Sequence, residues 1–414
     1  MDILKESRKQ LIKLIMTTIT GNFGSSILSF IIGLLILKKT ESALNFGISQ
    51  IIGPLVALVL VPFVGAIVDK YNKKIVIVIA QTFSIVSLLL YALSLNSNAE
   101  TNLINTYLLL ICLKVADQFL NNAFSSSVKK VVCEEYIQKV KSFQQIASSG
   151  VYIISPILAV FLLTKLELIH FVLLEAVIEF ITILIVLFIN FNLIKNEGTE
   201  NNEEKKVLHL FVEGIKYMKD KKVLVFIIFF AMFINFLMAS VSVGLPYVLI
   251  NEIKISDYLY GIVNASFPIA MIVSSIILSI MKDIEYPLEF SFKWLRGTTG
   301  FLLFLGIALL FKLSTSSYFI VFIIFAFGFD FVANFANTPM LGWFTKAIPN
   351  EYQGRVFSII ETGCQLLMPL GILFYSILFD KFKSSYIFIF SGIVLMVFIF
   401  LPYILKIDLK TKEI

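Results

Sequence analysis

The sequence predicts an all-α membrane protein with twelve transmembrane helices in two pseudo-symmetric six-helix bundles, and three observations lead to this prediction. The 414 residues are 58% hydrophobic and only 15% charged, with a mean hydropathy of +0.91. A water-soluble chain of this length cannot bury so much apolar surface. The apolar residues form runs long enough to cross a bilayer. Finally, the two halves of the chain match each other at a fixed offset.

A transmembrane helix needs about 20 apolar residues, and twelve runs of that kind occur. The start of the ninth run is the least distinct, because Trp294, Arg296 and Gly297 interrupt it. The predicted spans are Leu14–Leu37, Leu44–Val68, Ile75–Leu95, Leu103–Val128, Phe143–Leu163, Leu168–Ile194, Val223–Ile250, Tyr258–Met281, Leu295–Phe311, Tyr318–Phe344, Val356–Phe379 and Tyr386–Leu405.

The loops predict the orientation, because positive charge resists translocation across the membrane. With the N-terminus inside, the cytoplasmic segments hold 26 of the 34 Lys and Arg residues when Arg296, at the cytoplasmic edge of the ninth span, is counted with them. We therefore expect a multi-pass protein of the cell membrane with both termini cytoplasmic, and no cleavable signal peptide is visible. The expected domains are an N-terminal bundle (1–194), a cytoplasmic linker with a short amphipathic helix (195–222) and a C-terminal bundle (223–414).

An internal repeat appears when the sequence is shifted by 216 residues. The polar loop after the fourth span then aligns without gaps with the loop after the tenth: Lys130 with Lys346, Glu135 with Glu351, Tyr136 with Tyr352, Lys139 with Arg355 and Ser142 with Ser358. Because most of these residues are polar, shared hydrophobicity does not explain the match. The chain is therefore predicted to be an internal duplication, as in many transporters.

The same offset aligns two polar stripes within the spans. Each stripe has the spacing i, i+4, i+7, which places its members on one face of a helix. In hydrocarbon such a face is expected to turn toward the bundle interior or a water-filled pathway, although the amides could instead join helices by hydrogen bonds. The stripes are Lys114, Gln118 and Asn121 in the first half, and Asp330, Asn334 and Asn337 in the second.

Ionisable side chains in the apolar runs are functional candidates, because a charge at mid-bilayer costs at least a few kcal/mol. Lys114 and Asp117 are three residues apart and could simply neutralise each other. Glu175 and Glu179, in the outer half of the sixth span, cannot both ionise cheaply, so one of them is expected to hold a proton. The alternative is a protonated pair used only for packing. Asp330 lies on the second polar stripe, and Glu361 could brace a cytoplasmic gate.

A loop motif resembles the signature of the major facilitator superfamily. The loop after the second span reads Gly65-Ala-Ile-Val-Asp69-Lys70-Tyr-Asn72-Lys73-Lys74, against the family pattern G-x-x-x-D-[RK]-x-G-[RK]-[RK]. Asn72 stands where the family has Gly, and since Asn tolerates a left-handed conformation we expect the turn to be kept. The resemblance implies the major facilitator fold, with this loop acting as a conformational gate.

Two further stretches resemble the macrolide and multidrug exporters within that superfamily. One is Phe211-Val-Glu-Gly-Ile-Lys-Tyr217, and the other is Ile348-Pro-Asn-Glu351-Tyr-Gln-Gly354-Arg355-Val-Phe-Ser358. The conformational gate is therefore expected to include five more residues: Glu135, Glu351, Gly354, Arg355 and Glu361. The span-five antiporter motif is altered, since Ser155 stands before Pro156 where the family has Gly.

The expected activity combines this resemblance with the charges of the spans. The resemblance implies alternating access, and five carboxylates against one lysine favour lipophilic cations and protons over anions. We expect efflux of lipophilic, cationic drugs or toxic metabolites by proton antiport. Two alternatives stay open: an importer or facilitator of a small neutral metabolite, and a non-transporting membrane sensor or lipid-handling protein.

Enzymatic chemistry is not expected. The two histidines, His170 and His209, form no Ser/His/Asp or metal-binding pattern with other residues. We therefore expect neither cofactor nor metal. The expected partners are a small lipophilic substrate, protons and the lipid bilayer, with no nucleic acid, and the chain is expected to be a monomer.

Overall fold

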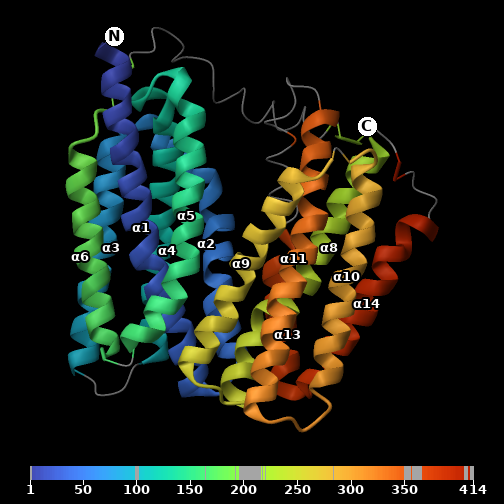
Figure 1. Cartoon of the computed structure of the whole chain (residues 1–414). Helices are drawn as coiled ribbons and strands as arrows, with labels where there is room; N and C mark the ends of the chain where they lie inside the picture. The colour runs from blue at the N-terminus through green and yellow to red at the C-terminus, as the bar shows by residue number, and fades with distance from the viewer. Residues whose placement is uncertain are drawn as a thin grey trace. The chain divides into compact units, whose positions relative to one another are not determined.

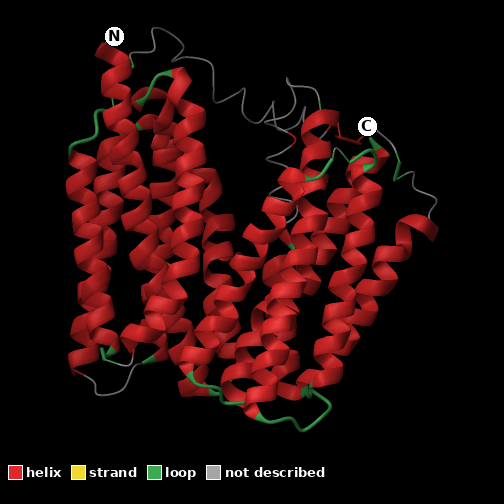
Figure 2. Ribbon diagram, viewed as in Figure 1, coloured by secondary structure: helices red, strands yellow, loops and turns green. Residues whose placement is uncertain are grey.

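The computed structural model describes residues 2–97, 102–163, 165–191, 193–194, 216, 218–219, 221–282, 284–348, 356, 366–404 and 409–410. Every regular element within these residues is helical (Figure 2). The helices, labelled in Figure 1, are α1 (Asp2–Thr40), α2 (Ala43–Lys70), α3 (Lys73–Ser97), α4 (Leu103–Val131), α5 (Glu134–Leu163), α6 (Leu168–Leu187), α8 (Lys222–Tyr247) with a π-helical end (Val248–Glu252), α9 (Asp257–Ile280), α10 (Pro287–Ala308), α11 (Thr315–Ala347), α13 (Met368–Lys381) and α14 (Ser384–Ile404).

The predicted spans overlap helices with shifted bounds, and the eleventh is described as a helix only from Met368, because residues 357–365 lie outside the described residues. Among the described residues, ten helices are long and apolar enough to cross a membrane. The ninth span begins at Pro287 of α10, eight residues before the predicted start at Leu295. The predicted start lies too far along the chain because Trp294 and Arg296 interrupt the apolar run. In the helix these side chains are accommodated by aromatic contacts, and the Arg296 guanidinium lies 5.0 Å from the ring centroid of Phe400.

The helices divide into two compact units. The first comprises residues 1–39 and 48–199, and the second comprises residues 40–47 and 200–414. The first turn of α2 therefore groups with the second unit, although the rest of that helix belongs to the first. No feature of the sequence predicted this assignment, and hydrogen bonds from Ser42, Ala43 and Leu44 join this turn to Asp380 of α13.

The helix bounds repeat at the offset found in the sequence. Helices α4 and α11 end at Val131 and Ala347, which are 216 residues apart, and α6 and α14 begin at Leu168 and Ser384, also 216 apart. The pairing of helices repeats as well, since α3 packs on α4 and α6 in the first unit, and α10 packs on α11 and α14 in the second. The two units are thus built on the same plan.

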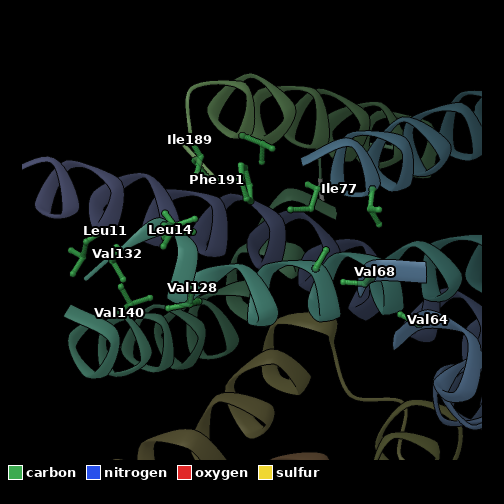
Figure 3. Close-up of a cluster of buried hydrophobic side chains, with 14 residues drawn as sticks. Leu11, Leu14, Val64, Val68, Ile77, Val128, Val132, Val140, Ile189 and Phe191 are labelled. Carbon is green, nitrogen blue, oxygen red and sulfur yellow. The ribbon is translucent and has the colours of Figure 1, made fainter. Parts of the chain in front are cut away.

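Each unit has a buried apolar cluster at the helix ends that the loop charges predict to be cytoplasmic. In the first unit all six helices or the residues next to them contribute (Figure 3): Leu11, Leu14, Val64, Val68, Val76, Ile77, Ala123, Val128, Val131, Val132, Val140, Val186, Ile189 and Phe191. The second unit has Met218, Leu224, Ile227, Leu288, Trp343, Phe344, Ile348 and Val356. These clusters hold the ends of the helices together, and in the first unit Val68 and Val76 lie on either side of the signature loop.

The loop of the family signature keeps its tight turn, since α2 ends at Lys70 and α3 begins at Lys73. Among the described non-glycine residues, only Glu41 and Lys254 have positive φ, so Asn72 makes this turn without the left-handed conformation that we expected. The Asn72 side chain instead accepts a hydrogen bond from Lys74 N at 3.0 Å, which caps the start of α3. The Lys74 ammonium in turn donates to Leu187 O at 2.6 Å, a free carbonyl at the end of α6.

The structure describes some of the other predicted gate residues. Gly65 lies within α2, Lys70 ends that helix with an exposed side chain, and Lys73 begins α3. Glu135 is exposed in the first turn of α5, where its charge suits the helix dipole. Asp69 is described by its backbone alone. The remaining gate residues, Glu351, Gly354, Arg355 and Glu361, and most of the predicted linker helix lie outside the described residues.

Candidate functional site

Glu175 and Glu179 are buried in the interior of the first unit. Their side chains are 3% and 5% exposed, although they lie on a helix whose other side chains include several exposed Leu, Val and Phe residues. The sequence placed them in the outer half of a span reaching Ile194. Because α6 ends at Leu187, the two carboxyl groups flank the midpoint of the helix instead. Both carboxyl groups are therefore buried near the middle of the helix.

Each carboxyl group faces a different neighbouring helix. Ser25 Oγ of α1 lies 3.1 Å from Glu175 Oε1, and Gln81 Nε2 of α3 lies 3.4 Å from Glu179 Oε2. The carboxyl group of Glu175 lies directly against Gly24 of α1, since a Cβ at that position would overlap Glu175 Oε2 and displace the carboxyl group. Helices α1, α3 and α6 together enclose the acidic pair.

The charges of α4 form an ion pair. Lys114 Nζ lies 2.9 Å from Asp117 Oδ2, with the two side chains 35% and 30% exposed. The stem of Lys114 packs over Gly53 of α2, where a Cβ would come within 3.4 Å of Lys114 Cδ. Lys114 and Asp117 therefore neutralise each other, which is one of the roles that their spacing predicted. Because Lys114 is paired with Asp117, Glu175 and Glu179 form no ion pair with a basic side chain among the described residues of the first unit.

In the second unit, Asn334 joins α11 to α9. Its Nδ2 lies 2.7 Å from Ser274 Oγ, 2.9 Å from Ser275 Oγ and 3.1 Å from Met271 O, and its Oδ1 accepts from Thr338 Oγ1 at 3.0 Å. Several acceptors compete for its two amide hydrogens, so the amide is fully engaged between the helices. This is the helix-joining role that the sequence left open for the amides.

The two polar stripes have the same gradient of exposure. Lys114, Gln118, Asp330 and Asn334 are half-buried, whereas Asn121 and Asn337, the last members, are exposed. Lys114 and Asp330 occupy matching positions with opposite charge. The stripes are therefore equivalent in burial but differ in chemistry, with an ion pair in one and an aspartate beside an inter-helix amide in the other.

Several residues of this site were not predicted from the sequence. Gln81 is an amide in the middle of an apolar run, and the rule that selected Gln118 would have found it. Gly24 and Ser25 gave no signal, because small residues are common in membrane helices. Ser274 and Ser275 were missed for the same reason. Only the packing of the helices brings these residues against the predicted ones.

The fold and the buried polar groups define a class: a polytopic helical membrane protein made of two repeated bundles, with ionisable side chains inside the apolar interior. The comparisons with known proteins give the family. The profile of the Major Facilitator Superfamily matches residues 14–284 and 228–413, so the chain belongs to this superfamily. It is a secondary transporter of small substrates, not an enzyme.

Individual relatives are distant. Macrolide efflux protein A of Streptococcus pyogenes is 23% identical over 399 residues, covering 93% of this chain and 94% of the relative. Among solved structures, the nucleoside transporter NupG matches with a TM-score of 0.70 at 11% identity, covering 96% of this chain and 99% of that one. The D-xylose–proton symporter matches with a TM-score of 0.65 at 12% identity, covering 94% and 96%. At such identities these structures support the fold alone.

Proposed function

We propose that the chain is a proton-coupled exporter that moves lipophilic, cationic compounds out of the cell by alternating access. The observation that carries the proposal is the acidic interior of the first unit, where Glu175 and Glu179 are buried without a basic partner among the described residues. A buried carboxyl group of this kind alternates between a neutral and a charged form as its access to water changes. The similarity to a macrolide efflux protein supports the outward direction.

In this mechanism the two units carry different tasks. Protons from outside reach Glu175 or Glu179 in the first unit, and substrate from the cytoplasm or the inner leaflet moves toward Asp330 in the second. Asn337 is exposed and available to a substrate, whereas the Asn334 amide already holds α9. The negative charge of Asp330 favours a cation over an anion. Discharge of the cation accompanies protonation, so that a proton gradient drives export.

The direct test is uptake into inside-out vesicles carrying the full chain. Proton-driven uptake of a macrolide and of a lipophilic cation is expected for the wild type, and it should fall in Asp330→Asn and in at least one of Glu175→Gln and Glu179→Gln. Glu289→Gln is the matched control, because Glu289 is an acid at the start of α10 that already has a basic partner, Lys293, at 2.9 Å. Unchanged proton-dependent uptake in all three test variants would remove these carboxylates from the mechanism.

The same assay distinguishes the alternatives. Uptake that persists after the proton gradient is collapsed favours a facilitator of a neutral metabolite, and substrate movement in the inward direction favours an importer. A growth-inhibition panel with and without expression, across macrolides and diverse toxic cations, would then identify the substrate class. The cell membrane location and the cytoplasmic termini belong to the same proposal and rest on the loop charges.

A further inference from the structure

The hydroxyl group of Ser25 contacts two acceptors but has one hydrogen to donate. Its Oγ lies 2.7 Å from Gly21 O and 3.1 Å from Glu175 Oε1. The shorter distance is the usual one for a hydroxyl donor, so the hydrogen points to the Gly21 carbonyl. Ser25 then has no hydrogen left to donate to Glu175.

The length of that contact also argues against an ionised Glu175. A hydroxyl that donates to a carboxylate makes a charge-assisted bond of about 2.5–2.7 Å. The observed 3.1 Å is longer than that and longer than the serine's bond to a neutral backbone carbonyl. The contact therefore lacks the short length of a charge-assisted bond from the serine to a carboxylate, and a neutral carboxyl group has a hydrogen of its own to place between the two oxygens.

The second oxygen of Glu175 gives independent support. Oε2 is buried and has no hydrogen-bond partner among the described residues, and it packs against the α1 backbone at Gly24. A buried ionised carboxylate needs donors on both oxygens, because an unpaired buried charge is far more costly than an unpaired neutral acceptor. Glu179 differs, since the Gln81 amide has a hydrogen available to donate to it.

We propose that Glu175, not Glu179, is the proton-carrying member of the pair, and that Ser25 is its positioning residue. This assignment rests on the proposed function only for its role in coupling. In the protonated state, Glu175 Oε1–H donates to Ser25 Oγ and Ser25 donates to Gly21 O. When the proton leaves to water, the serine hydrogen turns from Gly21 O to the carboxylate, so the α1 backbone loses one hydrogen bond. The neighbouring ionisable groups are Glu179 on α6 and the Lys114–Asp117 pair on α4.

Infrared spectroscopy of the purified full chain in lipid nanodiscs tests the assignment through the carbonyl stretch of a protonated carboxylic acid. The band should be present at neutral pH in the wild type, lost in Glu175→Gln and retained in Glu179→Gln and Asp330→Asn. Absence of the band in the wild type, or its loss in Glu179→Gln alone, would overturn the proposal.

The serine is tested without altering the carboxyl group, which keeps the proposal falsifiable if Glu175→Gln does not fold. Ser25→Ala should shift the band, Ser25→Thr should restore it, and Ser26→Ala is the matched control on the same helix. An unshifted band in Ser25→Ala would refute the role of Ser25. Vesicle uptake that ignores the proton gradient while the band behaves as expected would overturn the proposed function and leave this assignment standing.

Discussion

Removal of the Asp380 carboxylate should loosen the start of α2. This side chain, at the end of α13, receives three hydrogen bonds: from Ala43 N at 2.6 Å, from Ser42 Oγ at 2.8 Å and from Leu44 N at 3.2 Å. Ser42 Oγ in turn accepts from Asn45 N at 3.3 Å. The first backbone N–H groups of α2, which no helical carbonyl can satisfy, are therefore paired by residues of both elements.

The magnitude follows from the energetics of helix caps. Loss of an N-cap interaction costs about 1 kcal/mol, within a range of about 0.5–2 kcal/mol. The ionic character of Asp380 would increase this value, but its side chain is exposed and water screens the charge, so we keep about 1 kcal/mol. That free energy corresponds to a roughly fivefold larger opening constant for the first turn of α2 in Asp380→Ala. Asp380→Asn retains one acceptor and should give a smaller effect.

Amide hydrogen exchange measured at Ala43 and Leu44 in nanodiscs is the appropriate assay, because it reports local opening of the helix end. Ser314→Ala is the matched control: Ser314 Oγ accepts from Ser317 N at 3.2 Å and caps α11, so its removal should speed exchange there and leave α2 unchanged. Equal exchange at Ala43 and Leu44 in the wild type and Asp380→Ala would refute the reasoning, since the carboxylate would then contribute nothing to the cap.

Three further substitutions test the packing and capping of other helices. Gly371→Ala should destabilise the chain by about 1–3 kcal/mol, because its Cβ would lie 2.5 Å from a backbone carbonyl of α8, whereas Gly342→Ala meets no atom within 4 Å; equal melting temperatures would contradict this. Asn72→Ala should cost about 1 kcal/mol as a lost cap and speed amide exchange at the start of α3, while Asn72→Gly should cost only a few tenths. Asn334→Ala should lower thermal stability by about 1–2 kcal/mol, and Asn337→Ala, at an exposed position, should not; the reverse order would argue against the inter-helix role.

The order of apolar and polar residues along the chain predicted most of the architecture. Apolar runs give helices in a bilayer because every backbone polar group must be satisfied within the segment. The duplication was readable because it preserved polar loop residues, and the helix ends at Val131 and Ala347 carry the same offset. Where the pattern was mixed, as around Trp294, the predicted start was displaced, since hydropathy does not register the aromatic contacts that accommodate a charged neighbour.

The sequence by itself determined the helical class, the internal repeat and the acidic character of the spans, because these depend on composition and on spacing along one helix. Only the tertiary structure decided which acid meets which helix. Ser25 lies 150 residues from Glu175, and Asp380 lies more than 330 residues from the helix start that it caps. Such contacts arise from the packing of separate helices, where a small residue such as Gly24 permits close approach, and no periodicity within a single segment encodes them.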